Sequence, residues 1–187
     1  MNKELNLSFS ILKSVYFDNA YANIELNKIL KNKVEDVNYS LITKIVYGVL
    51  ERDIYLDYAV KPFIKPVTKP VIKLILKIGR YLKENVNSVP DYTIVNELVN
   101  ISKKYGDKFV SGFVNATLKN ILKTQVKLPK EGTIEYLNIN YSYPKWILTE
   151  LLKYKSYDFI KDMISKELTT LTHIRILKNP KNFEIKY

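Results

Sequence analysis

Residues 71–84 are the most constraining stretch of the sequence, because a helix over them is apolar on three sides. The polar residues of this stretch form only a narrow stripe, which consists of Lys73, Lys77, Arg80 and Glu84. A helix that is apolar nearly all round must be packed by neighbours on most sides. We therefore expect a central helix surrounded by partner helices, which is an all-α bundle.

The rest of the sequence up to residue 125 supplies these partners. Pro70 fits the first position of the central helix, because its fixed φ suits that position and its missing N–H costs nothing there. In the second helix, Ile24, Leu26 and Leu30 are candidates for the core. Including the central helix, apolar residues recur at helical spacing over about seven stretches, expected at residues 5–16, 21–31, 36–50 or 38–50, 54–63, 70–84, 90–105 and 107–123.

Composition excludes several classes of function. The chain has 187 residues, of which 47% are hydrophobic, so it can bury a core. It has no cysteine and a single histidine, His173, which excludes thiolate chemistry and leaves too few ligands for most metal sites. No apolar run is long enough for a signal peptide core or a membrane span. We expect a cytoplasmic protein with neither a metal nor a membrane partner.

The formal net charge of +11 favours a polyanionic partner such as RNA. Only three of the 30 basic residues are arginines, namely Arg52, Arg80 and Arg175. Because arginine is the better bidentate ligand of phosphate, and because lysine-rich usage also follows from an AT-rich genome, charge alone does not separate RNA binding from biased composition.

The expected seventh helix carries the nine residues GFVNATLKN, from Gly112 to Asn120. Gly112 and Ala116 are four residues apart, so another helix could approach closely there. Glycine and asparagine are both unfavourable inside a helix, so tertiary contacts should compensate for Gly112 and Asn115. The Asn115 amide is expected to be buried and to bind a neighbouring loop, or else to contact RNA directly; the same alternatives hold for Asn96 and Glu97 of the sixth helix.

Three segments, in order, carry a family resemblance. They are IVYGVLER at residues 45–52, PDYTIVNELV at residues 90–99, and GFVNATLKN. Together they resemble the NusB-type domain at the head of RsmB-type ribosomal RNA cytosine-5 methyltransferases. The resemblance covers about residues 5–123 and makes seven residues its motif positions: Gly48, Pro90, Asn96, Glu97, Gly112, Asn115 and Ala116. It implies a NusB-like helical, RNA-binding domain over residues 1–125.

The C-terminal third reads differently. Residues 126–137 are expected to form a linker, because Pro129 and Gly132 break the helical periodicity. The segment after Pro144 resembles the start of the family's pre-catalytic domain, with Trp146, Ile147, Leu148 and Leu151 facing inward. Residues 138–187 then read as an incomplete α+β fragment of two helices and two strands, the strands at residues 171–177 and 183–187. A lone hairpin is marginal in water, which favours truncation.

The resemblance also implies what a complete family member would contain. It implies an S-adenosylmethionine site on a Gly-rich turn and a catalytic cysteine, both in a C-terminal part that is missing from this sequence. The sequence has no G-x-G and no cysteine. We therefore expect this chain to have no cofactor, no catalytic residue and no methyltransferase activity of its own.

Six basic residues are the candidates for RNA binding. Four would form a basic ridge along the central helix, and two lie on the seventh helix: Lys69, Lys73, Lys77 and Arg80, then Lys119 and Lys123. A solvated helix face with no ligand explains the same pattern.

Three functions remain open at this level. The first is an accessory domain that binds RNA, most of all ribosomal RNA, for a methyltransferase. The second is a stand-alone NusB-like factor of transcription antitermination, which binds RNA and a protein partner. The third is a protein-interaction module whose charge is compositional. Steeply salt-dependent RNA binding would separate the first two from the third.

Overall fold

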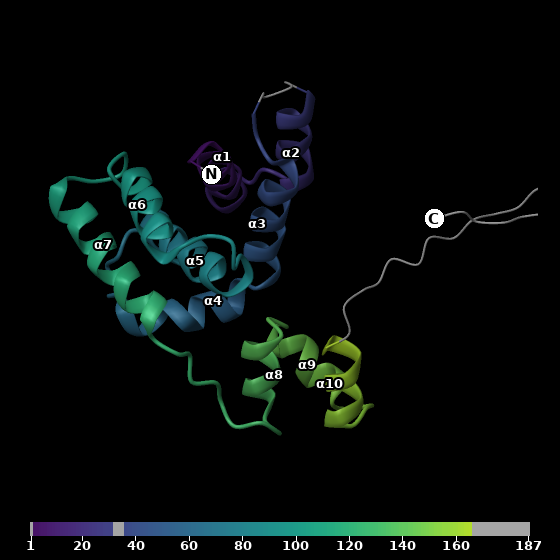
Figure 1. The fold of residues 1–187 in the computed structure, drawn as a ribbon. Coiled ribbons are helices and arrows are strands. Elements are labelled where there is room, and N and C mark those ends of the chain that lie inside the picture. The colour runs from purple at the N-terminus through teal and green to yellow at the C-terminus, as the bar shows by residue number, and fades with distance from the viewer. Residues whose placement is uncertain (1, 32–35, 166–187) are drawn as a thin grey trace, which may run out of the picture.

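The computed structural model describes residues 2–31 and 36–165, and in this part all of the regular secondary structure is helical (Figure 1). The bundle comprises α1 (Asn2–Phe17), α2 (Ala22–Lys31), α3 (Tyr39–Glu51), α4 (Asp53–Val60), the 3₁₀ helix η1 (Lys61–Phe63), α5 (Pro70–Asn85), α6 (Asp91–Ser102) and α7 (Lys108–Lys123). Three short helices follow: α8 (Ile134–Asn140), α9 (Lys145–Leu151) and α10 (Tyr157–Ser165). The all-α class and the seven α-helices before residue 124 are confirmed.

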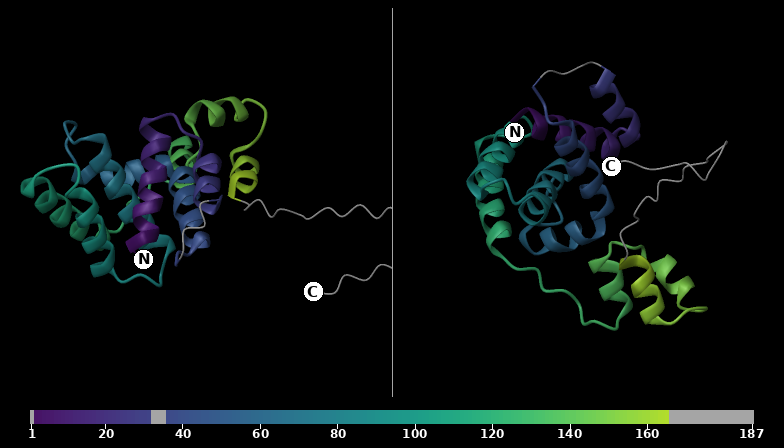
Figure 2. Two further views of the ribbon diagram at one scale, coloured as in Figure 1. Left: turned by 90° about the horizontal axis from the view of Figure 1, so that it is seen from above. Right: turned by 45° about the vertical axis from the view of Figure 1, so that its right-hand side comes forward.

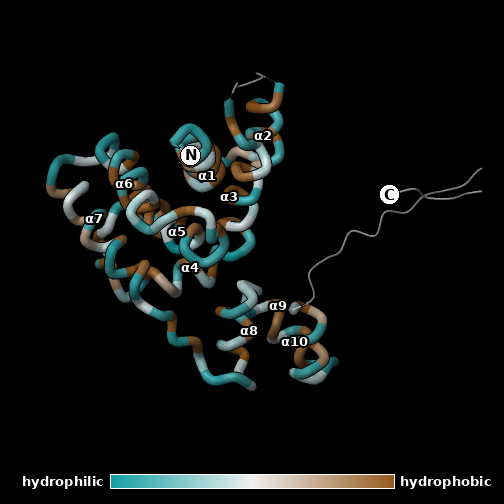
Figure 3. Tube along the Cα trace, in the orientation of Figure 1, coloured by the Kyte–Doolittle hydropathy of each residue, from teal (hydrophilic) through white to brown (hydrophobic). Residues whose placement is uncertain are grey.

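Helix α5 is the centre of the bundle. It begins at Pro70 and contacts α1, α3, α4, α6 and α7. Its residues from 74 to 82 are all buried, including the two charged ones. Figure 2 shows the other helices around it, and Figure 3 shows hydrophobic residues along α5 and α6. The three-sided apolar pattern of the sequence is thus satisfied by helices on every side.

Local signals set the ends of two outer helices. The Asn38 side chain accepts a hydrogen bond from the Leu41 N–H at the start of α3. The Asp107 side chain accepts from the N–H groups of Phe109 and Val110 at the start of α7. Asparagine and aspartate are favoured here because they satisfy amides that have no partner within the helix.

Close helix packing occurs at glycines other than Gly112. A Cβ at Gly48 would lie 2.0 Å from the Tyr81 hydroxyl oxygen, and a Cβ at Gly79 would lie 2.5 Å from a methyl of Leu118. Gly48 lets α3 approach α5 closely, and Gly79 lets α7 approach α5 closely. Gly112 has no neighbouring atom within 4 Å of such a Cβ. The expectation of a helix packed against Gly112 and Ala116 is wrong, because that side of α7 is exposed.

The second helix buries less than its sequence suggests. Leu26 is buried, as expected, but Ile24 and Leu30 are exposed. Among the described elements, α2 packs mainly against α1 and α3. One apolar row of α2 is therefore enough to attach it to the bundle.

The segment after α7 differs from the expected linker and helix pair. Residues 124–133 have no helix, but α8 begins at Ile134, so part of the expected linker is helical. Leu137, Leu148 and Ile160 join α8, α9 and α10 in a small second core. Trp146 was expected to face inward, but it is 74% exposed. The two expected strands lie outside the described residues.

The second core rests against the bundle through α4 and α8. The backbone N–H of Tyr55, in α4, donates a hydrogen bond to the Ser142 hydroxyl at 3.0 Å. Ile139 of α8 also packs against the main core. The three short helices are therefore attached at one side of the bundle (Figure 1).

Candidate nucleic-acid interface

The expected basic ridge on α5 does not exist as an exposed surface. Lys77 is 5% exposed and Arg80 is 7% exposed. The Lys77 ammonium forms ion pairs with Asp53 and, at 3.0 Å, with Asp57, and it lies 5.0 Å from the centre of the Tyr16 ring. Because neighbouring helices cover α5, charged residues on its polar stripe form internal ion pairs.

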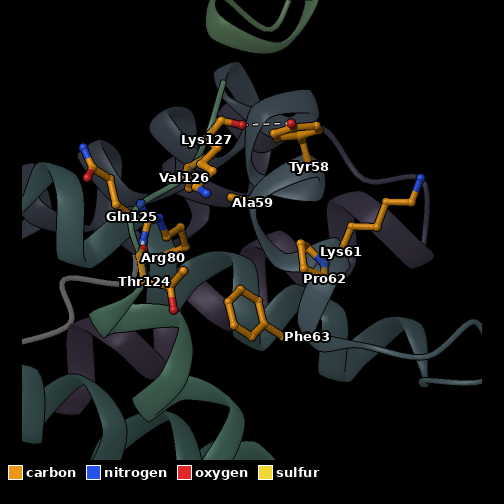
Figure 4. Close-up of a pocket in the computed structure, with 10 residues that line it drawn as sticks. All are labelled: Tyr58, Ala59, Lys61, Pro62, Phe63, Arg80, Thr124, Gln125, Val126 and Lys127. Carbon is orange, nitrogen blue, oxygen red and sulfur yellow. Dashed lines mark hydrogen bonds between the residues drawn. The ribbon is translucent and has the colours of Figure 1, made fainter. Parts of the chain in front are cut away.

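Arg80 has a structural role that the sequence did not indicate. Its guanidinium pairs with Glu84 at 2.6 Å and donates hydrogen bonds to the carbonyl oxygens of Ile121 and Thr124, both at 2.9 Å. The Tyr58 hydroxyl donates to the carbonyl oxygen of Lys127 at 2.9 Å. These bonds hold residues 124–127 in place, and these residues line one side of a pocket of about 360 Å³ (Figure 4).

The other two lysines of the expected ridge, Lys69 and Lys73, are less buried than Lys77 and Arg80. Lys69 is exposed, and its ammonium lies 3.5 Å from the carbonyl oxygen of Tyr105. Lys73 is half-buried and lines a depression of about 480 Å³ together with Lys61 and Lys65. The turn that contains the prolines between α4 and α5 therefore brings Lys61 and Lys65 close to Lys73. Helical spacing alone could not predict this position.

A groove between α6 and α7 gathers the polar motif residues. It has a volume of about 460 Å³, and its lining consists of Asp91, Tyr92, Val95 and Asn96 from α6 with Asn115, Lys119, Leu122 and Lys123 from α7. Four sequence candidates that lie on two separate helices, Asn96, Asn115, Lys119 and Lys123, thus share one concave surface.

The structure corrects the expected role of Asn115. Its side chain is half-buried at the groove, and it makes no hydrogen bond to a loop within the described part of the chain. Asn96 is exposed at the same groove. Glu97 points elsewhere: its Oε2 is buried and has no hydrogen-bond partner among the described residues. The two amides are therefore available to a ligand, whereas Glu97 is not part of the groove.

Tyr92 is the groove residue that the sequence reasoning missed. Its side chain is 70% exposed at the groove, one helical turn before Asn96. The four-residue spacing from Asn96 was the signal that could have found it. At the rim of the groove, Asp91 is paired with Lys83 at 2.8 Å.

The chemistry of this groove is that of binding. Amides both donate and accept hydrogen bonds, ammonium groups attract phosphate, and an exposed phenol ring can stack on a base.

Within residues 2–31 and 36–165, no cluster of histidine, aspartate or glutamate side chains is arranged to hold a metal ion. None of the described helices is long and apolar enough to cross a membrane.

The match to known proteins lies mainly on the helical bundle. The model of the NusB family matches residues 3–123, which is α1 to α7. The chain belongs to the NusB family. The RsmB-type resemblance is supported by a relative from Bacillus subtilis, a probable ribosomal RNA small subunit methyltransferase B, which is 36% identical over 136 residues. A transcription antitermination protein NusB from Pseudoalteromonas atlantica is 29% identical over 110 residues.

The two relatives are covered to different extents. The methyltransferase match includes 70% of this chain but only 30% of the relative's length. The antitermination protein match includes 57% of this chain and 78% of the relative's length. The chain therefore shares a NusB-type bundle with both relatives, and with the methyltransferase it shares less than a third of that protein.

Proposed function

We propose that this chain is an RNA-binding domain, that its α6–α7 groove contacts the RNA, and that the RNA is ribosomal. The observation that carries this proposal is the convergence of Asn96, Asn115, Lys119 and Lys123 on one groove. Motif residues from separate helices meet there beside two exposed ammonium groups. Such a set combines phosphate attraction with hydrogen bonding to bases.

The methyltransferase relative supports the choice of a ribosomal target. Its match covers 136 residues, which is more than the 121 residues of the NusB-type stretch. In this proposal the domain holds RNA as an accessory to methyl transfer and contributes no catalytic group. The depression around Lys61, Lys65 and Lys73 provides a second cationic surface for the same RNA.

Two other functions compete with this one. The antitermination relative favours a stand-alone RNA-binding factor, because the bundle covers most of that protein's length. A protein-interaction module is favoured by α7, where Phe109 is 85% exposed and Phe113 is also exposed. Exposed aromatic side chains of this kind are enriched at protein interfaces.

The test is direct binding of the purified chain to a single-stranded RNA oligonucleotide, measured by fluorescence anisotropy. We expect binding that weakens steeply as salt rises, and we expect the Lys119→Ala/Lys123→Ala variant to bind more weakly than a Lys44→Ala control. Lys44 is exposed on α3, away from the groove. Absence of binding at low salt, or equal binding by both variants, would contradict the proposal.

A further inference from the structure

The pocket beside residues 124–127 is separate from the α6–α7 groove. Its lining comes from α4, from η1, from Arg80 of α5 and from the chain after α7, and no residue lines both sites (Figure 4). Its volume of about 360 Å³ lies at the lower end of the range of preformed ligand pockets. The pocket therefore has room for a side chain of a bound peptide.

The surface inside this pocket is mainly apolar. Ala59, Pro62 and Phe63 come from α4 and η1, and Val126 comes from the chain after α7. The ring of Tyr58 also lines the pocket, and its hydroxyl already donates to a backbone carbonyl oxygen. An apolar side chain gains free energy by leaving water in such a site, whereas a sugar or a phosphate group does not.

The rim of the pocket is positively charged. Three cationic residues and no carboxylate line it. Arg80 is paired with Glu84, but Lys61 and Lys127 are exposed and form no ion pair with other described residues. Residues 123–130 contain three lysines and no acidic residue. A ligand that complements this charge carries carboxylates beside its apolar group.

The chain after α7 also offers backbone groups that have no partner. Residues 125–130 belong to no helix, and Figure 1 shows them as an open stretch between α7 and α8. Within the described residues, the N–H groups of Gln125, Val126 and Lys127 and the carbonyl oxygens of Gln125 and Val126 make no hydrogen bond. An extended peptide can pair with such groups, because its own backbone alternates donors and acceptors.

This stretch is held in place at both ends before any ligand binds. The carbonyl oxygen of Thr124 accepts a hydrogen bond from Arg80, and that of Lys127 accepts one from Tyr58. Binding to a preorganised segment loses less free energy to the ordering of the chain.

We propose that this pocket binds a partner protein through a short acidic segment. The segment lies extended along residues 124–128, places one large apolar side chain in the pocket, and directs its carboxylates to Lys61 and Lys127. RNA could satisfy the two lysines, but it offers neither an apolar side chain nor a peptide backbone. The proposal goes beyond RNA binding, because it gives a second kind of partner to a surface that the groove does not include.

The test measures binding of labelled peptides to the purified chain by fluorescence anisotropy. The probe is a fluorescein-labelled heptapeptide with a central phenylalanine flanked on each side by three glutamates. We expect it to bind at least about 10-fold more tightly than the same peptide with a central serine, because a buried phenylalanine contributes this much. A peptide with lysines in place of the glutamates should not bind.

A third peptide tests the backbone contact. It carries N-methyl groups on the two residues that flank the phenylalanine, which removes two N–H donors and keeps the charge. We expect it to bind about 10-fold more weakly than the probe, because the carbonyl oxygens of Gln125 and Val126 then lose their donors.

One variant and a matched control assign the binding to the pocket. Lys127→Glu reverses an exposed charge at the rim and should weaken binding of the probe by about 10-fold. Lys44→Glu makes the same change in net charge on α3, away from the pocket, and should bind nearly as well as the unchanged protein. Far-UV circular dichroism checks that both variants are folded.

The outcomes separate this proposal from the proposed function. Absence of binding at millimolar probe, or equal affinity for the phenylalanine and serine peptides, overturns it. Equal binding of the probe by Lys127→Glu and Lys44→Glu overturns it as well. If oligouridine RNA binds more weakly to Lys127→Glu and the probe does not bind at all, the pocket belongs to RNA instead. RNA binding at the groove is measured separately through Lys119 and Lys123, so either proposal can fail alone.

Discussion

Arg80 donates a hydrogen bond to the carbonyl oxygen of Thr124 at 2.9 Å, across 44 residues of sequence. Thr124 is the C-cap residue directly after α7, and its own N–H donates to the carbonyl oxygen of Asn120. One buried guanidinium on the central helix therefore fixes the direction in which the chain leaves the bundle. The three helices that follow are positioned by this bond and by the contact of Tyr55 with Ser142.

Replacing Arg80 should strongly destabilise the protein. Arg80→Ala removes the cation that pairs with Glu84, whose carboxylate still accepts from the Tyr55 hydroxyl, and leaves two carbonyl oxygens without this donor, which should cost about 3–5 kcal/mol. Arg80→Lys retains the charge but loses the fork geometry, at a cost of about 2 kcal/mol. The measurement is urea unfolding followed by circular dichroism. As control, Lys83→Ala removes an exposed ion pair and should change the free energy of unfolding by less than about 1 kcal/mol.

Alanine should have opposite effects at Gly48 and Gly112. At Gly48 the new methyl would displace the Tyr81 ring, whose hydroxyl donates to the Lys44 carbonyl, and should cost about 2–3 kcal/mol. At Gly112 the methyl meets no atom, and the gain in helix propensity should stabilise the protein by up to about 1 kcal/mol. Urea midpoints measure both changes, and loss of stability in Gly112→Ala would indicate a partner on that face.

Stability should fall above about pH 10 through Tyr16, whose ordinary pKa lies near that value. Burial, and then the hydrogen bond and charge of Asp53, raise the pKa of the Tyr16 hydroxyl far above its ordinary value. Because the unfolded chain loses this proton first, the native state binds more protons there, and the free energy of unfolding decreases as pH rises. The contribution is complete below about pH 10.

The comparison for this pH effect is Tyr16→Phe, with unfolding by urea followed from pH 8 to pH 11. The variant should be less stable at pH 8, because the hydrogen bond to Asp53 is lost, and its stability should decline less steeply at high pH. Parallel curves for the two proteins would show that Tyr16 is not the group responsible.

Leu148 and Trp146 should differ sharply although they are two residues apart. Leu148 is fully buried in the second core, and Leu148→Ala should cost about 2–5 kcal/mol. Trp146 is 74% exposed, and Trp146→Ala should change the stability by about 0.5 kcal/mol or less. Thermal unfolding followed by far-UV circular dichroism measures both, and a large effect of Trp146→Ala would place its ring in a contact.

The groove lysines should determine part of the salt dependence of RNA binding. For single strands, the slope of log affinity against log salt falls by about 0.7 for each phosphate contact removed. Lys119→Ala/Lys123→Ala should therefore reduce the slope by about 1.4. Lys44→Ala should leave it unchanged. Anisotropy titrations at several salt concentrations give the slopes, and equal slopes would remove both lysines from the RNA contact.

Helix positions and the class of fold could be predicted because they depend on local chemistry. The apolar period of residues 71–84, Pro70 at the start of α5 and Asp107 before α7 act over a few residues of chain. Three short segments were enough to indicate the family, and the match over residues 3–123 agrees with them.

The surface roles of individual residues could not be predicted in the same way. Lys73 and Lys77 are four residues apart on one helix and share one polar stripe, yet Lys73 is half-buried beside Lys61 and Lys65, whereas Lys77 is buried against Asp53. Helical spacing gives the side of a helix but not what covers that side. Gly48 and Gly112 are both glycines of the family motif. Only the packed structure shows that a neighbouring side chain lies close to Gly48 and that none lies close to Gly112.

The sequence by itself thus determined an all-α bundle with a central apolar helix, because hydrophobic period, proline and helix caps act locally. Tertiary structure alone decided that Arg80 binds the end of α7, that Lys77 is an internal cation, and that Asn96 and Asn115 face one groove. The physical reason is that burial of a charge and convergence of side chains depend on how helices distant in sequence pack, which the pattern of one helix does not contain.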